Sequence, residues 1–138
     1  MIGMLVVAHG RFASGLLDGA KLILGDLENI DAHELLEGAD MDEFKEAMYE
    51  KIRKLDQGKG VMVLVDLFGA TPFNTAGSLL GRLQEENIAL RVITGVNLPM
   101  VLEGSFMRTQ HDSVETFYSE LLGVGNESIV ELKEAMGL

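Results

Sequence analysis

The chain has 138 residues, of which 47% are hydrophobic and none is cysteine, and its formal net charge at pH 7 is −11. The length predicts a single domain, residues 1–138, with a sizeable core, and no apolar segment is long enough to span a membrane. The acidic balance without a cluster of lysine and arginine disfavours nucleic acid and anionic membranes as partners, and the lack of cysteine excludes disulfides and thiolate metal sites.

The beginning of the chain is predicted to form a buried strand followed by a helix. Met1–Ala8 is short, almost wholly apolar and followed by Gly10, as is typical of a strand. The same stretch is too short for a signal sequence and has no basic leader, which predicts a cytoplasmic protein. Helical spacing of apolar residues then predicts a helix over Ser14–Leu24 with Gly25 as its stop, and Ile30–Leu36 is a weaker candidate strand.

The middle of the chain repeats this alternation of strand and helix. Asp40 is the predicted N-cap of the next helix, in a capping box completed by Glu43. Val61–Val65 is an uninterrupted apolar run, and such strands are typical of a parallel sheet that is covered on both faces. Thr71 followed by Pro72 then predicts a helix with a threonine N-cap and proline at its first position.

The last third of the chain continues the pattern and has an ambiguous end. Ala89–Thr94 is predicted to be a strand, and Pro99–Arg108 and Ser113–Leu122 are predicted to be helices. Apolar spacing over Glu127–Met136 fits a helix, whereas Ser128–Leu132 could equally be an edge strand. Because strand and helix alternate four times, we predict an α/β fold with a doubly wound, four-stranded parallel sheet flanked by helices.

Polar residues follow three of the predicted strands. His9 and Asp66 each stand at the end of an apolar run, and Asn97 lies in the turn after the last strand. The carboxyl ends of parallel strands open onto one edge of the sheet, so His9 and Asp66 would face each other if their strands were neighbours. A carboxylate bound to Nδ1 leaves the Nε2 lone pair free and stabilises the cation that forms when Nε2 attacks an electrophile. The pair therefore predicts His9 as a nucleophile.

Glycines and a hydroxyl near this pair suit a phosphoryl group. Gly10 and Gly15 bracket a loop before the first helix, and a second loop carries Gly69, Ala70 and Thr71. Backbone N–H groups at both helix starts would bind the same anion, and the Thr71 hydroxyl would add a further donor. Phosphoryl transfer needs mainly positioning and charge stabilisation, so these groups suffice without a metal or another cofactor.

Several other functions are disfavoured because the sequence lacks the residues that they require. The chain has neither the phosphate loop of nucleotide-binding proteins nor the Gly-x-Gly-x-x-Gly of dinucleotide-binding ones. Its histidines lack the spacing of metal ligands, and His33 and His111 are predicted to lie at the surface. Ser14 lacks the first glycine of a nucleophile elbow, and Ala8 stands where a histidine phosphatase would have arginine.

A purely structural role stays open for each candidate residue. His9 could be a histidine at a strand end whose hydrogen bonds are satisfied within the chain and which has no chemical role. Asp66 could serve merely to cap the turn after its strand. Thr71 could serve only as an N-cap, which is compatible with binding phosphate. Asn97 could serve only the turn before Pro99, or it could contact a partner protein.

Three stretches of the sequence together resemble the IIA component of the mannose-type (mannose–fructose–sorbose) sugar phosphotransferase system. They are Val6–Gly10, Asp66–Asn74 and Gly95–Met100, and in order and length the resemblance covers nearly the whole chain. It implies a phosphotransferase that acts as a histidine phosphocarrier. His9 would accept a phosphoryl group on Nε2 from the carrier protein HPr and pass it to a IIB component, which serves the membrane IIC and IID subunits. The sugar is not implied, because the IIA component does not touch it.

The resemblance also implies roles for particular residues. The active histidine of the family falls on His9 and its partnering aspartate on Asp66. The serine that contacts phosphate falls on Thr71, and the chain departs from the family there, because Ala70 and Thr71 stand where glycine and serine are usual. Phe68 stands where a tryptophan is often found, so it would keep an aromatic surface for contact with a partner protein.

The resemblance implies a homodimer as well, because better-known members of the family exchange a C-terminal strand between subunits. This favours the strand alternative for Ser128–Lys133. Two other functions stay open. The phosphocarrier subunit of the phosphotransferase-dependent dihydroxyacetone kinase looks similar around its histidine, although Gly69–Asn74 fits the sugar-transport branch better. A non-catalytic regulatory domain of the same fold would sense phosphorylation at His9 without passing the group on.

Overall fold

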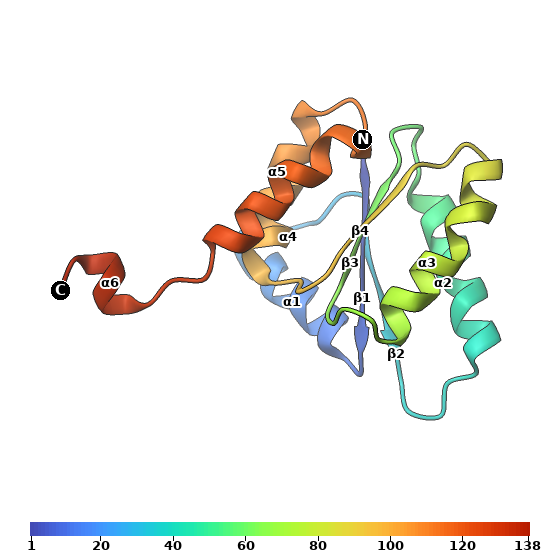
Figure 1. Cartoon of the computed structure of the whole chain (residues 1–138), viewed down its shortest axis with the longest axis horizontal. Helices are drawn as coiled ribbons and strands as arrows, with labels where there is room; N and C mark the ends of the chain where they lie inside the picture. Colours follow the sequence, from blue (N-terminus) through green and yellow to red (C-terminus); the bar gives the residue numbers. More distant parts are fainter.

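The computed structural model describes residues 1–138 and contains one parallel sheet of four strands with helices on both faces (Figure 1). The strands, in the spatial order β2-β1-β3-β4, are β1 (Gly3–His9), β2 (Ile30–Leu35), β3 (Val61–Val65) and β4 (Leu90–Ile93). The helices are α1 (Phe12–Leu24), α2 (Met41–Leu55), α3 (Thr71–Glu85), α4 (Leu98–Met107), the 3-10 turn η1 (Arg108–Gln110), α5 (Val114–Glu127) and α6 (Leu132–Met136). The predicted fold class and all four predicted strands are confirmed.

The two central strands, β1 and β3, are buried on both faces. Successive side chains of a strand point to opposite faces. Met4 and Val6 accordingly pack with α1, α4 and α5, whereas Leu5 and Val7 pack with α2 and α3. Figure 1 shows these two layers of helices on opposite sides of the sheet. Burial on both sides explains why the runs that form β1 and β3 are almost continuously apolar.

Three predicted helix ends are confirmed by their local hydrogen bonds, whereas α1 starts two residues before the predicted Ser14 and α5 continues five residues beyond the predicted Leu122. The side chain of Asp40 accepts a hydrogen bond from the backbone N–H of Glu43 at 2.9 Å, and Ser113 caps α5 in the same manner. Gly25, with φ +77°, follows the last residue of α1. None of the helices has the length and apolar composition that crossing a membrane requires.

The prediction for the start of α3 was wrong by one residue. The N-cap is Ala70, whose backbone is extended, and Thr71 and Pro72 are the first two residues of the helix. The left-handed turn at Gly69, with φ +77°, brings the chain into helical geometry one residue earlier than the threonine–proline pair indicates. The Thr71 hydroxyl is therefore not used as a cap.

The predicted surface position of His33 was also wrong. This side chain is buried under α2, where its Nε2–H donates to the carbonyl oxygen of Phe44 at 2.9 Å and its ring stacks on the Phe44 ring. His111 is half-buried and contacts Glu120 and Thr116. Burial lowers the pKa of His33 more than the Phe44 carbonyl raises it, so the folded chain favours the neutral ring.

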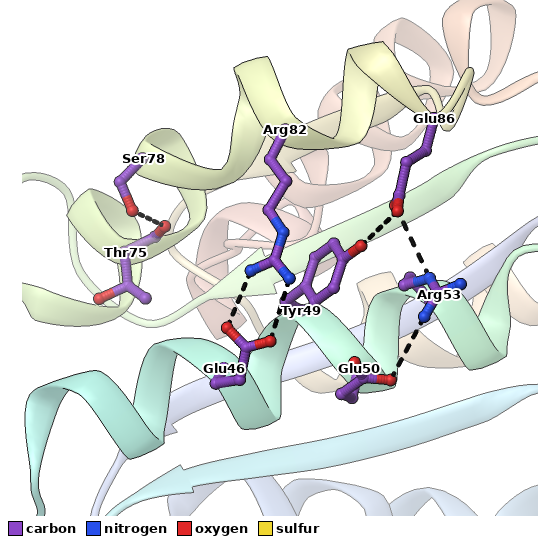
Figure 2. Close-up of polar contacts among 8 residues, drawn as sticks. All are labelled: Glu46, Tyr49, Glu50, Arg53, Thr75, Ser78, Arg82 and Glu86. Carbon is purple, nitrogen blue, oxygen red and sulfur yellow. Dashed lines mark hydrogen bonds and ion pairs between the residues drawn. The ribbon is translucent and has the colours of Figure 1, made fainter.

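A cluster of aromatic and charged side chains joins α2 to α3 on the outside of the molecule (Figure 2). Two nitrogens of Arg82 donate to the Glu46 carboxylate at 2.8 and 3.0 Å, and the guanidinium lies 3.4 Å from the centre of the Tyr49 ring. The Tyr49 hydroxyl donates to Glu86 at 2.5 Å, and Arg53 approaches the same carboxylate from α2. These contacts fix the two helices of one layer relative to each other.

The end of the chain leaves the body of the molecule (Figure 1). After α5, residues 129–131 have no regular structure and the short α6 follows. The helical alternative is thus seen over a shorter range than predicted, and the strand is not formed in this single chain. Between 63% and 83% of each large apolar side chain in this tail is exposed; these residues are Ile129, Val130, Leu132, Met136 and Leu138.

We expect the free energy of unfolding to decrease as the pH falls below about 6.5, the pKa of an unperturbed histidine. The unfolded chain binds a proton there, whereas the lowered pKa of buried His33 delays protonation of the folded chain. The slope contributed by one histidine approaches about 1.4 kcal/mol per pH unit. Urea unfolding between pH 7.5 and 5 measures it, and the His33→Gln variant should show a smaller slope. An equal slope in the two proteins would contradict this assignment.

Candidate active site

β1 and β3 are neighbours, and their carboxyl ends bring His9 and Asp66 together. His9 Nδ1 lies 2.7 Å from Oδ2 of Asp66, and the backbone N–H of His9 donates to the same oxygen at 3.0 Å. The carboxylate acceptor assigns the ring proton to Nδ1, which leaves the lone pair on Nε2. Nε2 makes no hydrogen bond within the chain, and 49% of the His9 side chain is exposed.

The pair lies at the topological switch point of the sheet. From β1 the chain passes to β2 on one side and then to β3 on the other, so α1 and α3 leave this point on opposite faces. Ligands of doubly wound proteins bind at the carboxyl ends of the strands at such a point. The strand order therefore places His9 and Asp66 where this fold class binds its ligands.

Asp66 is held in its charged form. Burial of the carboxylate raises its pKa. Hydrogen bonds from the backbone and the ring of His9 together lower the pKa by more than burial raises it, so the pKa of Asp66 lies below the usual value. A negative charge is consequently present beside Nδ1 at neutral pH. It favours an imidazolium over a neutral ring whenever Nε2 takes up an electrophile.

Two helices start beside the pair without a side-chain cap. The N-cap of α1 is Arg11 and that of α3 is Ala70, and neither makes a capping hydrogen bond. At the same edge of the sheet, Asp40 and Asn97 cap α2 and α4. The uncapped starts leave backbone N–H groups available, and the helix dipoles favour an anion there. Only the two helices that follow β1 and β3 have this property at this edge.

Glycines are needed in both turns for conformational reasons. Gly10 has φ +59° and Gly69 has φ +77°, which is the left-handed region that other residues rarely adopt. No atom lies within 4 Å of the position that a Cβ would take at either residue. The tight turns let each helix begin directly beside the end of its strand.

The side chain of His9 points to the face of the sheet that α3 covers. Val7 packs against α2 and α3, and His9 is two residues further along the same strand. α3 begins at Thr71, whose hydroxyl makes no capping bond. Alternation therefore directs the His9 side chain toward the layer that contains α3, whose first residue is Thr71, and away from the layer that contains α1.

The surroundings of His9 are open and partly apolar. Leu67 is 58% and Phe68 75% exposed, and the Phe68 ring packs 4.9 Å from that of Phe73. The two largest cavities, of about 510 and 490 Å³, lie at the amino end of the sheet and do not include His9. Because sites for small molecules are concave, an exposed imidazole beside exposed apolar side chains suits a protein surface better.

Asn97 lies at the same edge, but its amide has two partners within the chain. Oδ1 accepts from the backbone N–H of Met100 at 3.1 Å, and Nδ2 donates to the Ser128 hydroxyl at 3.2 Å. The structural alternative for this residue, a turn before Pro99, takes the form of an N-cap for α4. No cluster of three or more histidine, aspartate or glutamate side chains could hold a metal ion.

Sequence reasoning missed the polar cluster on the other side of His9. The Ser14 hydroxyl donates to Glu34 at 2.6 Å, and Arg11 lies 3.8 Å from the second oxygen of the same carboxylate. Glu34 is in register with Ala8, one residue before the histidine. No local pattern marks Glu34, because its position depends on β2 pairing with β1.

These features define a doubly wound α/β protein with a histidine–aspartate pair at the switch point of its sheet. The sequence model of the family described as "PTS system fructose IIA component" matches residues 3–122. The chain therefore belongs to the mannose- and fructose-type IIA family of the phosphotransferase system. This membership confirms the resemblance on which the sequence-based expectations rest.

Known relatives agree in sequence and fold. The mannose-specific EIIAB component of Escherichia coli is 32% identical over 132 residues, which are 96% of this chain and 40% of that relative. The fructose-specific EIIA component of Bacillus subtilis is 28% identical over 128 residues, which are 93% of this chain and 84% of that relative. The crystal structure of phosphotransferase system component EIIA from Streptococcus agalactiae matches with a TM-score of 0.86 and 29% identity, covering 95% of this chain and 97% of that one.

We expect the neutral His9 ring to carry its proton on Nδ1, because Asp66 Oδ2 is the acceptor there. Nitrogen-15 chemical shifts of the imidazole at alkaline pH measure the tautomer. In the Asp66→Ala variant the Nε2–H tautomer should become populated while the fold is kept. Unchanged shifts in a folded Asp66→Ala protein would contradict the orienting role of the carboxylate.

Proposed function

We propose that the chain is a histidine phosphocarrier of a sugar phosphotransferase system, in which His9 accepts a phosphoryl group from phospho-HPr and passes it to a IIB component. The observation that carries this proposal is the free Nε2 of a half-exposed imidazole whose Nδ1 is bound by Asp66. Membership of the IIA family supports it. In this proposal residues 1–138 are one cytoplasmic IIA unit that acts without a cofactor.

The transfer step follows from the state of the two ring nitrogens. The donor phospho-HPr is expected to carry its phosphoryl group on a histidine. The Nε2 lone pair of His9 attacks phosphorus, and the P–N bond to that histidine breaks with its electron pair returning to the donor ring. The new Nε2–P bond leaves the proton on Nδ1, so the ring becomes a cation next to the Asp66 carboxylate. Transfer to the IIB component breaks the Nε2–P bond in the same way and restores the neutral ring.

The phosphoryl oxygens would be bound mainly from the α3 side. Backbone N–H groups of the Gly69–Ala70 turn and the Thr71 hydroxyl stand at the start of α3, the helix toward whose layer the His9 side chain is directed, and no capping side chain competes for them. The N–H groups that follow Gly10 at the start of α1 would contribute from the other face. The arrangement supplies charge-stabilising donors to an anion without a metal.

Partner proteins would dock on the apolar rim of this edge. Phe68 is the most exposed large side chain of the loop that contains Asp66, so we propose it as the main contact. The amide of Asn97 already has two partners within the chain, so we propose that Asn97 shapes this surface by holding the start of α4 in place.

We expect His9→Ala to abolish phosphorylation by phospho-HPr, because Nε2 of this residue is the nucleophile. His111→Ala is the matched control and should accept phosphate like the unaltered chain, since His111 lies in the loop before α5. Radiolabelled phosphate transfer measures the result, and the product should be labile in acid, as a phosphohistidine is. Asp66→Ala should accept phosphate more slowly.

An acid-stable phosphoprotein, or a His9→Ala protein that is phosphorylated like the control, would refute this assignment. The acceptor decides between the candidate functions. Transfer to a panel of IIB proteins supports the sugar-transport function, and transfer only to dihydroxyacetone kinase subunits supports the phosphocarrier of that kinase. Phosphorylation of His9 without transfer to any acceptor would support the regulatory alternative.

We also propose that the chain forms a homodimer through its C-terminal tail. The tail exposes five large apolar side chains, which a second copy would cover. Light scattering should give the mass of a dimer for the full chain and of a monomer for a chain that ends at Ser128. A monomeric full chain, or a truncated chain that still dimerises, would contradict this proposal.

A further inference from the structure

The loops at the carboxyl edge of the sheet contain only one cationic side chain. The segments that follow the four strands are residues 10–11, 36–40, 66–70 and 94–97, and Arg11 is the only lysine or arginine among them. The whole chain has a formal net charge of −11. A phosphoryl group adds about two negative charges at neutral pH, so a cation beside His9 matters for the transfer.

Arg11 is held only loosely in the structure. Its side chain is 78% exposed, and its terminal nitrogen lies 3.8 Å from Glu34, which is too far for a hydrogen bond. Two other arginines of the chain form closed pairs instead: Arg82 with Glu46 at 2.8 Å and Arg91 with Glu115 at 2.6 Å. Exposed pairs with open geometry contribute little free energy, so the Arg11 guanidinium can readily change partner.

Glu34, by contrast, is fixed. Its carboxylate accepts the Ser14 hydroxyl at 2.6 Å through the oxygen that Arg11 does not approach, and only 22% of its side chain is exposed. It stands on β2 in register with Ala8, so it lies on the opposite side of β1 from Asp66. Glu34 thus places a fixed carboxylate near the Arg11 guanidinium, and it pairs with the residue that precedes His9.

We propose that Arg11 contacts the phosphoryl group at His9, exchanging the Glu34 carboxylate for phosphoryl oxygens as the group arrives. This inference rests on the proposed function of His9 and deepens it. The N–H groups and the Thr71 hydroxyl at the start of α3 serve one side of the phosphoryl group, and Arg11 reaches it from the side of α1. A guanidinium is suited to this exchange because its planar set of N–H donors matches both carboxylate and phosphate.

The test uses phosphoramidate, a small phosphoryl donor that needs no partner protein. Phosphorus-31 NMR follows the formation of phosphohistidine in the full chain. We expect Arg11→Gln to slow the formation of phosphohistidine about tenfold, because a factor of this size corresponds to the loss of one hydrogen bond to a charged group. Glu34→Gln should accelerate it, because the competing charge is removed while an acceptor for Ser14 is kept. Lys21→Gln, in the last turn of α1, removes the same charge and should match the unaltered chain.

Three results would overturn the inference: Arg11→Gln reacts as fast as the unaltered chain, Lys21→Gln is slowed as much as Arg11→Gln, or Glu34→Gln is slowed. Thermal unfolding of each variant separates loss of fold from loss of contact. If the unaltered chain gains no phosphohistidine beyond that of His9→Ala, the proposed function itself fails. If His9 is phosphorylated at a rate that Arg11→Gln does not change, only the inference about Arg11 fails.

Discussion

One carboxylate oxygen determines the geometry of the site. The backbone ladder between β1 and β3 ends at the pairing of Val7 with Val65, and beyond it Oδ2 of Asp66 accepts both the backbone N–H and the ring of His9. On the other side of β1, the N–H of Gly10 donates to the carbonyl oxygen of Leu35 at the end of β2. The end of the strand that carries the imidazole is thus fixed from both neighbouring strands, so the orientation of the ring is set within the chain itself.

The same pair resolves an electrostatic conflict. A carboxylate next to an incoming phosphoryl group would repel it, yet Asp66 remains charged. The imidazole separates the two anions, because the carboxylate binds Nδ1 and the free Nε2 points to the other side. In the proposed step the ring becomes a cation between two negative groups, which stabilises the phosphorylated state without neutralising the aspartate.

Helix capping separates the two helix starts beside the histidine–aspartate pair from the other helix starts of the sheet's two layers. Asp40 and Asn97 cap α2 and α4, and Ser113 caps α5, whereas α1 and α3 begin without a capping side chain. An N-cap contributes about 1 kcal/mol, so leaving two helices uncapped gives up stability. Proteins accept such local losses at sites where backbone donors are needed for a ligand. The two uncapped helices are those that flank the histidine–aspartate pair.

Local chemistry in the sequence determined the strands, the capped starts of α2 and α5 and the candidate pair. Apolar runs gave β1 and β3, and a capping box gave the start of α2, because these signals depend only on neighbouring residues. The prediction that His9 faces Asp66, by contrast, required β1 and β3 to be neighbours in the sheet. Strand order is decided by pairing between segments that are distant in sequence, so the sequence pattern could not establish it. The start of α3 shifted because the left-handed turn at Gly69 is not encoded by the threonine–proline pair alone.

Burial of polar residues was likewise decided by the tertiary structure. His33 stacks under α2, and the buried Arg108 donates to the carbonyl oxygens of Ile2 and Asn29, which lie far from it in sequence. Glu34 meets Arg11 only because β2 pairs with β1. The sequence alone thus determined which residues could do chemistry at the ends of strands. The fold decided which of them meet, because hydrogen bonds and burial between distant segments have no local signature.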